Sequence, residues 1–248
     1  MQERLTVYYA KKNKSKNLKI ILTVLISVFC LLGVWMFSLK NKNINNCFNS
    51  NEFYFVVVGE DLSEISANKY KQQIENYGGA GVLLDNSYGL YSVIIFAYNN
   101  EIDAQKIKLN TSKIFKNCYV ECLKTSKINK KTQDKIKSIS GVDEAITRIY
   151  ESISFSSKLL FDYEKSNISF SELTRYAIAF SDKLIDNKNK LSFADDISSY
   201  IKASISMLQK SIDIFITQSI ASNDSIKYFK KFCVQTVLEY IKIMNYIV

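Results

Sequence analysis

A run of 20 uncharged residues covers positions 20–39 of the chain. As a helix rising about 1.5 Å per residue, this run spans the roughly 30 Å hydrocarbon layer of a bilayer. A buried core helix and a cleaved signal peptide are the alternatives. The run is longer than the apolar part of a signal peptide, and the following SLKNKNINN contains no small-residue cleavage site. We therefore expect an uncleaved transmembrane helix over residues 18–39.

The charges on the two sides of this segment are unequal. Five lysines lie between positions 11 and 19, whereas only Lys40 and Lys42 follow the segment closely. Because basic flanks favour the cytoplasmic side of a membrane, we expect the basic tail over residues 1–17 in the cytoplasm. The chain is then a single-pass protein of the cell membrane. A polar tether over residues 40–51 and all later residues are expected outside the cytoplasm.

The formal charge of +9 is concentrated at the N-terminus. Residues 1–42 contain eight basic residues and one acidic residue, and the other 206 residues contain 25 basic and 23 acidic ones. A nucleic-acid-binding domain needs a basic surface that neutralises phosphates, and it commonly uses arginine. This chain has only three arginines, Arg4, Arg148 and Arg175. We expect no nucleic-acid partner.

The chain contains no histidine. This excludes Ser-His-Asp and Cys-His nucleophiles, His-ligated zinc and haem on a proximal histidine. The sequence also lacks GxGxxG, P-loop and GxSxG motifs. Its neighbouring carboxylates, such as Glu60-Asp61 and Asp195-Asp196, point away from each other. We predict a protein that is not an enzyme and that has no catalytic residue, cofactor or metal site.

The five cysteines lack CxxC spacing, so they predict neither a zinc site nor a disulfide framework. On a strand, Cys118 and Cys122 would share one face about 13 Å apart, at 3.3 Å per residue, which is beyond disulfide reach. Burial is the expectation for cysteines in apolar segments. Cys47 stands alone on the predicted tether and is a candidate for a bridge between two chains.

The composition of the chain changes near residue 125. Five of the seven glycines lie between positions 59 and 89, and none follows Gly141. Before the change, strand-like and helix-like runs alternate in the order βαββαβ. The predicted strands cover residues 53–58, 81–84, 90–96 and 118–123, and the predicted helices cover residues 62–77 and 102–115. We expect an α+β domain over residues 52–125, with a ferredoxin-like four-stranded antiparallel sheet and two helices on one face.

The motifs of this domain follow a defined course: a strand ending in glycine, a helix with alanine, a glycine turn, a Tyr-Val-rich strand and a second helix. The pieces are Tyr54-Phe55-Val56-Val57-Val58-Gly59, Ala67 with Tyr70, Tyr77-Gly78, Gly89-Leu90-Tyr91-Ser92-Val93-Ile94, and Tyr98 followed by Glu101, Asp103 and Ala104. In these features the segment resembles the SPOR (sporulation-related repeat) domain. The resemblance implies binding to peptidoglycan through the open sheet face, especially to glycan strands stripped of peptide at a division or sporulation septum.

Two positions depart from the family pattern, because Val57 replaces a common glutamine and Phe96-Ala97 replaces a common glycine. The candidate glycan-binding residues are Tyr54, Val57, Glu60, Ser87, Tyr88, Leu90 and Ser92, with Tyr91 as a further candidate. For each tyrosine, ordinary packing in the core or at its rim is the alternative explanation.

Alternation places Phe55 and Val57 on one face of the first strand, and Leu90, Ser92, Ile94 and Phe96 on one face of the third strand. If these are the open faces, the surface is unusually apolar and needs a cover.

After residue 125, apolar residues repeat every three or four positions in four stretches. These stretches begin at Val142, Leu173, Ile201 and Ile226, and helix-start signals separate them: Ser169 and Ser171 with Glu172, Ser192 with Asp195, and Asn223-Asp224-Ser225. We expect an all-α region of four helices over residues 126–248. Short connections favour an up-down bundle or helical hairpins, and the alternative is a coiled-coil assembly surface, for example one packed on the open sheet face.

Two functions follow from these expectations. In the first, a single-pass membrane protein presents a SPOR-like domain to peptidoglycan glycan strands during cell division or sporulation. In the second, the protein is a non-enzymatic scaffold whose SPOR-like domain has lost sugar binding and which binds other envelope or divisome proteins. Burial of Phe55, Val57 and Ile94 under the helices would leave no place for glycan, whereas an open groove would favour the first function.

Overall fold

The computed structural model describes residues 47–85, 90–192, 195–220 and 225–248, without the side chains of residues 60–62. Cys47–Val248 form one compact unit. In the described ranges, no helix is long and apolar enough to cross a membrane. The predicted tail, transmembrane helix and residues 40–46 of the tether lie outside the described residues.

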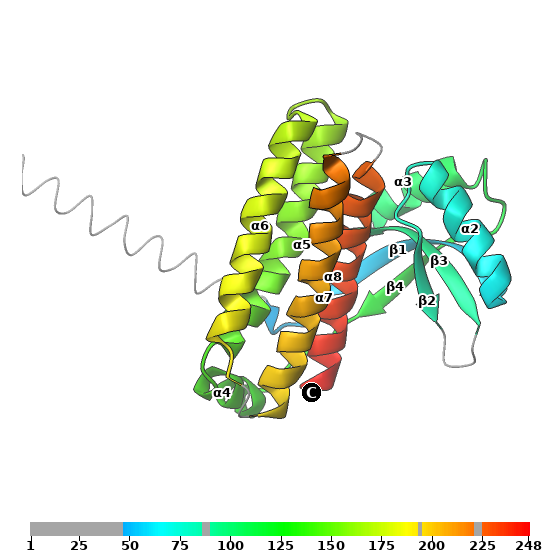
Figure 1. The fold of residues 1–248 in the computed structure, drawn as a ribbon. Coiled ribbons are helices and arrows are strands. Elements are labelled where there is room, and N and C mark those ends of the chain that lie inside the picture. The colour runs from blue at the N-terminus through cyan, green and yellow to red at the C-terminus, as the bar shows by residue number, and fades with distance from the viewer. Residues whose placement is uncertain (1–46, 86–89, 193–194, 221–224) are drawn as a thin grey trace, which may run out of the picture. The chain divides into compact units, whose positions relative to one another are not determined.

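The first part of the compact unit follows the predicted order of strands and helices. Its elements are β1 (Glu52–Leu62), α2 (Glu64–Asn76), β2 (Val82–Asp85), β3 (Tyr91–Tyr98), α3 (Glu101–Thr111) and β4 (Cys118–Lys124). The strands form an antiparallel sheet in the order β2-β3-β1-β4 (Figure 1). The prediction of an α+β fold with a four-stranded antiparallel sheet is confirmed.

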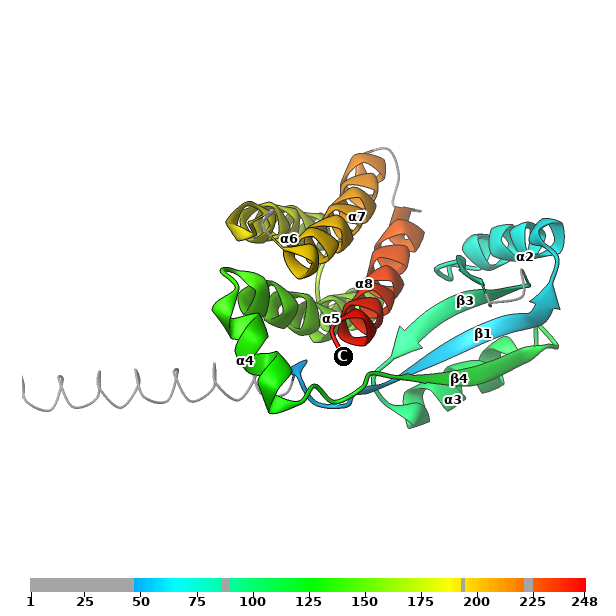
Figure 2. The ribbon, with the colours of Figure 1, turned by 90° about the horizontal axis from the view of Figure 1, so that it is seen from below.

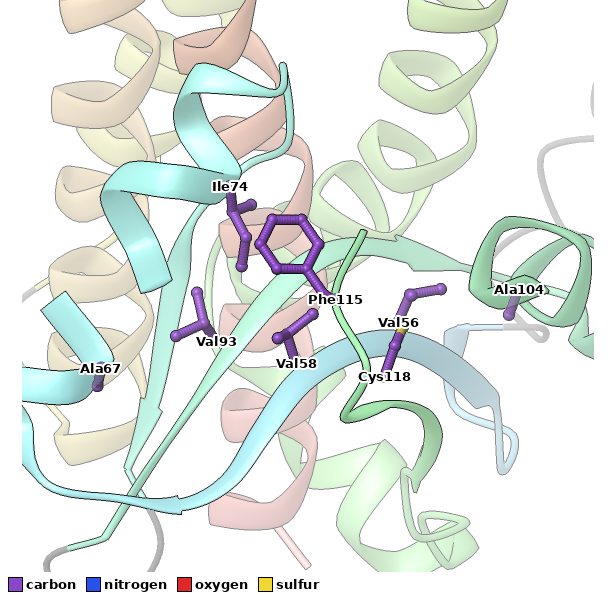
Figure 3. Close-up of a cluster of buried hydrophobic side chains, with 8 residues drawn as sticks. All are labelled: Val56, Val58, Ala67, Ile74, Val93, Ala104, Phe115 and Cys118. Atoms are coloured by element: carbon purple, nitrogen blue, oxygen red, sulfur yellow. The ribbon is translucent and has the colours of Figure 1, made fainter. Parts of the chain in front are cut away.

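Helices α2 and α3 cover one face of this sheet. Alternate residues of β1, Val56 and Val58, pack there with Val93 of β3 and Ile74 of α2 (Figure 3). Small side chains in this cluster, Ala67 of α2 and Ala104 of α3, are fully buried. Because successive side chains of a strand point to opposite faces, the residues between them in β1 face the other way.

Both helices begin at side-chain caps. The Ser63 hydroxyl accepts a hydrogen bond from the Ser66 N–H at 3.4 Å, and the Asn100 side-chain oxygen accepts one from the Asp103 N–H at 2.8 Å. Such caps satisfy backbone donors that lack partners in the first turn. Local sequence therefore sets where each helix starts.

The predicted face of Phe96 is wrong because β3 contains an irregularity. Val56 pairs with Phe96, but the next residue of β1, Val57, pairs with Ile94, so Ile95 is the extra residue on β3. Cross-strand partners share a face, and such a bulge interrupts the alternation. Phe96 therefore leaves the face of Ile94, and its ring contacts that of Tyr98 with centroids 5.2 Å apart.

The second part of the unit is helical. Its elements are α4 (Lys130–Ser138), α5 (Val142–Glu164), α6 (Phe170–Lys190), α7 (Asp196–Ser219) and α8 (Ile226–Tyr246). The four long helices match the four predicted apolar stretches, and α4 is an additional short helix. Two predicted helix-start signals lie at helix starts: Ser169 and Glu172 form a capping box at α6, and Asp195 of the signal Ser192 with Asp195 is the N-cap of α7.

The four long helices lie side by side as a bundle (Figure 1). Helix α7 packs against α6 and α8, and α5 packs against α6 and α8. Short connections make consecutive helices antiparallel, which is the up-down arrangement. Buried residues at helical spacing, including Ile146, Ile205, Ile212 and Val237, form the centre of this bundle.

Candidate functional site

The sheet face predicted to bind glycan is covered by the bundle. Helix α8 packs on β3 and β2, on the side opposite to α2 and α3 (Figure 2). Phe55, Val57 and Ile94 lie on this face, and none of them has exposed surface. At the start of β1, the ring of Phe53 makes an edge contact with Tyr240 of α8, with centroids 5.8 Å apart. The apolar face has its cover within the same chain.

An ion pair also links α8 to α2, which packs on the other face of the sheet. Lys231 Nζ of α8 lies 2.7 Å from Glu75 Oε1 of α2, and both side chains are largely buried. A buried pair of this kind strongly disfavours loss of one partner, because the remaining charge would be left without compensation. This contact favours a docked α8.

The candidate residues Tyr54, Val57, Leu90 and Ser92 lie in different environments. The Tyr54 hydroxyl donates a hydrogen bond to Glu52 Oε2 at 2.7 Å, which raises the pKa of Tyr54 to about 12. Tyr54 packs on the side of α2 and α3, whereas Val57 is fully buried on the opposite face. Ser92 is buried with its Oγ 3.3 Å from the Tyr119 hydroxyl, and Leu90 is half-buried before β3.

The other candidates lie wholly or partly outside the described residues. Glu60 belongs to β1, but its side chain lies outside the described part of the structure. Ser87 and Tyr88 lie in residues 86–89, which are outside the described residues. Among the candidates with described side chains, the structure gathers no set on one open surface.

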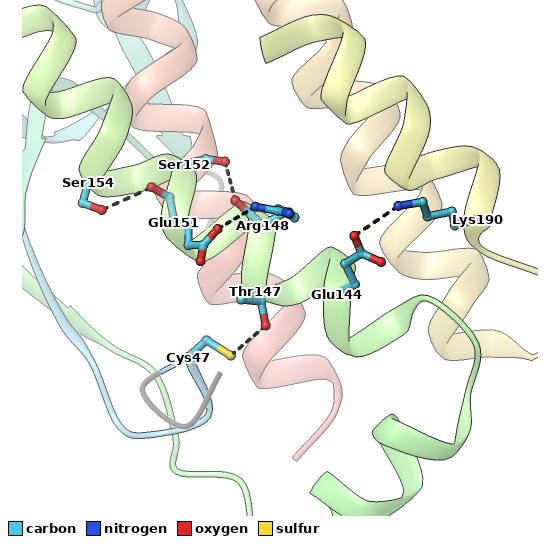
Figure 4. Close-up of polar contacts among 8 residues, drawn as sticks. All are labelled: Cys47, Glu144, Thr147, Arg148, Glu151, Ser152, Ser154 and Lys190. Atoms are coloured by element: carbon cyan, nitrogen blue, oxygen red, sulfur yellow. Dashed lines mark hydrogen bonds and ion pairs between the residues drawn. The ribbon is translucent and has the colours of Figure 1, made fainter. Parts of the chain in front are cut away.

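Residues 47–51 of the predicted tether are packed against the helices. Cys47 is fully buried, with its Sγ 3.5 Å from Thr147 Oγ1 of α5 (Figure 4). Tyr240 of α8 donates a hydrogen bond from its hydroxyl to the Cys47 carbonyl at 2.6 Å. Burial raises the pKa of the Cys47 thiol to about 11. The expectation of a thiol available for a bridge between chains is therefore corrected, because the segment docks through its polar groups.

A cavity of about 680 Å³ lies where the end of β3 meets α3, α5 and α8. Four aromatic side chains stand in its wall: Tyr77, Phe96, Tyr98 and Phe161. Tyr77 and Phe161 are 67% and 56% exposed, so both present their rings to solvent at the rim. The volume is in the range of about 300–1,000 Å³ that is typical of ligand pockets.

The polar lining of this cavity is mainly basic. Lys230 Nζ lies 2.8 Å from Glu164 Oε1, and Lys106 Nζ lies 3.6 Å from Asp103 Oδ1. Two further lysines in the wall, Lys158 and Lys165, have no carboxylate partner within the described residues. Burial, assisted by Glu164 and Asp103, raises the pKa of the Tyr98 hydroxyl, which therefore stays protonated at neutral pH.

These groups are suited to binding. The cavity offers cations, hydroxyls and aromatic surface, and its lining contains no cysteine and no histidine. In the described ranges, no three His, Cys, Asp or Glu side chains could together hold a metal ion. Sequence reasoning missed the cavity because its walls come from segments far apart in the chain. In the sequence, the aromatic residues and lysines of the wall lie on separate segments, and no local pattern marks them as neighbours.

Comparison with known proteins gives no relative for this chain: no family model matches it, and no curated protein or solved structure is significantly similar.

Proposed function

We propose that this chain is a non-enzymatic, single-pass membrane scaffold of the cell envelope, which binds other envelope proteins rather than glycan strands. One observation carries the proposal: α8 covers the sheet face on which Phe55, Val57 and Ile94 are buried. A SPOR-like domain would need this face for sugar binding. In this chain, the face instead packs against the chain's own helical bundle.

Glycan could reach this face only if α8 were displaced from the sheet. Burial of a Val, Ile or Phe side chain stabilises a fold by about 1.5–3 kcal/mol, so exposing these three residues alone costs roughly 5–9 kcal/mol. A ligand with a micromolar Kd supplies only about 8 kcal/mol in total. A glycan strand would spend most or all of its binding energy on opening the face.

The position at the membrane rests on the uncharged run over residues 20–39 and on the lysines that precede it. The resemblance to the SPOR domain is supported by the βαββαβ order of the elements in the sheet domain. Together they favour an envelope protein whose sheet and bundle lie outside the cytoplasm.

The first test is sedimentation of the full chain, purified in detergent, with sacculi whose stem peptides an amidase has removed. We expect no more chain in the pellet than with untreated sacculi. Sedimentation that increases with the amount of stripped glycan would contradict the scaffold function.

The second test is extraction of the full chain from its native membrane in mild detergent. A scaffold should migrate as a complex that contains other membrane or envelope proteins in fixed proportion. A chain that migrates alone, or only with copies of itself, would argue against partner binding.

A further inference from the structure

The cavity at the end of β3 combines buried apolar walls with an exposed aromatic rim. Phe96 and Ala97 of β3 and Leu160 of α5 line it, and all three are buried. Tyr77 and Phe161 line it as well, and both are more than half exposed. An apolar group in the cavity would therefore exchange water for contact with buried carbon and aromatic rings. These walls suit the apolar body of a small molecule.

The charges of the wall are unequal. Four lysines and two carboxylates line the cavity, and each carboxylate lies in an ion pair with one of the lysines. Lys158 and Lys165 are the lysines without a carboxylate partner within the described residues. Lys165 Nζ lies 5.8 Å from the centroid of the Phe161 ring, whereas Lys158 is exposed and makes no such contact in the described ranges. The surplus of positive charge favours an anionic occupant.

Helix α5 places this surplus charge beside an aromatic ring. Lys158 and Phe161 are three residues apart, and Lys165 follows Phe161 by four residues, directly after the last residue of α5. Residues at these spacings are neighbours on one helix face. A molecule with both a negative charge and an apolar body can therefore contact Phe161 and a lysine together. An inorganic anion would use the lysines alone.

A tyrosine hydroxyl in the wall also suits an anion. Tyr98 is half-buried with its ring against that of Phe96, and its hydroxyl makes no hydrogen bond to the described residues. Buried tyrosine hydroxyls usually have a hydrogen-bond partner. Burial raises the pKa of Tyr98, so at neutral pH its hydroxyl is protonated and can donate a hydrogen bond to an oxygen of a bound anion.

We propose that the cavity binds a small organic anion with an apolar ring system, whose carboxylate or phosphate lies near Lys158 and whose rings contact Phe161 and Phe96. A lysine ammonium is a point charge that pairs with either kind of oxyanion. The volume of about 680 Å³ is in the range of small-molecule pockets. The inference goes beyond the scaffold function, because a scaffold can hold its partners whether or not this cavity is occupied.

The test is isothermal titration calorimetry of the full chain in nanodiscs, with nanodiscs that lack the chain as the blank. The probes are naphthoate, naphthyl phosphate, the uncharged naphthamide and inorganic phosphate. We expect at least one naphthyl anion to bind at least about tenfold more tightly than both naphthamide and inorganic phosphate, a difference that corresponds to about 1.4 kcal/mol. The tighter of the two naphthyl anions shows which oxyanion the site prefers.

Two cavity variants separate the charge from the ring. Lys158→Gln should weaken the tighter naphthyl anion at least about threefold, because its charge partner is lost. The matched control is Lys127→Gln, at an exposed lysine outside the cavity lining, which should leave binding unchanged. Phe161→Ala should also weaken the anion at least about threefold, because a ring contact is lost.

The proposal is wrong if neither naphthyl anion binds, if naphthamide or inorganic phosphate binds as tightly, or if Lys158→Gln and Lys127→Gln have equal effects. The sedimentation and extraction tests above are independent of these results. A chain that migrates with other envelope proteins but binds neither naphthyl anion would overturn this site and leave the scaffold function standing.

Discussion

Substitution of Phe55 by alanine tests whether α8 stays on the sheet. Phe55 has no exposed surface, and it belongs to the face that α8 covers. Removal of a buried phenylalanine side chain costs about 3–5 kcal/mol, because transfer energy is lost and a cavity remains. With a slope of about 2 kcal/mol per molar urea, Phe55→Ala should lower the unfolding midpoint by roughly 2 M.

The matched control is Phe161→Ala, which removes the same side chain from an exposed site. Phe161 is 56% exposed on α5. Less than half of its burial energy is at stake, and alanine is the better helix former, so we expect a cost of about 0.5 kcal/mol. The midpoint should then move by about 0.3 M, the same cost divided by the same slope.

The assay is urea unfolding of residues 47–248, followed by circular dichroism at 222 nm. This fragment is the compact unit and contains both the cluster under α2 and α3 and the bundle core. If α8 leaves the sheet in solution, Phe55 is exposed and both variants should shift the midpoint equally. Equal shifts would refute the closed face and, with it, the main argument for a scaffold.

Three further predictions concern the same unit. Tyr240→Phe should lower the free energy of unfolding in urea by about 1–3 kcal/mol, because the Cys47 carbonyl loses its buried donor. Tyr246→Phe, at the exposed end of α8, should lower it by less than about 0.5 kcal/mol. Equal losses would contradict the docking of residues 47–51. A hydrogen bond from the Ser198 N–H lowers the pKa of the Asp195 carboxyl in the folded chain. The stabilisation from this hydrogen bond is therefore present above the unfolded pKa of about 3.9, and it is lost as the pH falls through the folded pKa. Wild type should lose more thermal stability than Asp195→Asn between pH 6 and pH 2, and parallel losses would contradict this. Cys122 is exposed, whereas burial raises the pKa of Cys47 to about 11, so maleimide at pH 8 followed by peptide mapping should label Cys122 first; labelling of Cys47 at the same rate would show an open segment.

Periodicity was enough to predict the order of the strands and of all helices except α4. The runs at 53–58 and 118–123 became β1 and β4, and the four long apolar stretches became α5 to α8. Short α4 was not predicted, because KKTQDKIKS contains one apolar residue, Ile136, and its start depends on the Asn129 cap. A single buried side chain gives no recognisable period.

Tertiary contacts explain the expectations that failed. The segment around Cys47 is polar, and polarity was taken as a sign of solvation, but Asn51 hydrogen-bonds Thr125, Tyr150 and Tyr240. Polar side chains that suit a solvated tether can also pack against the fold when hydrogen-bond partners are present. The bulge at Ile95 likewise depends on the pairing of two strands, which one strand's sequence does not reveal.

The arrangement of the layers narrows where a partner can bind the sheet. Helices α2 and α3 close one face and α8 closes the other (Figure 2). A sheet with both faces covered can offer only its edges to another molecule. The outer edge at β4 carries charges, and at the other edge β2 pairs with β3 as far as Ile94, beyond which the Ala80 N–H bonds the Ile95 carbonyl. Beyond Ile95, Phe96 and Ala97 are buried, and they line the cavity opposite Lys158 of α5. Closure of the glycan face by α8 and formation of the cavity are thus linked, because docking of α8 and α5 builds the wall of the cavity beside the end of β3.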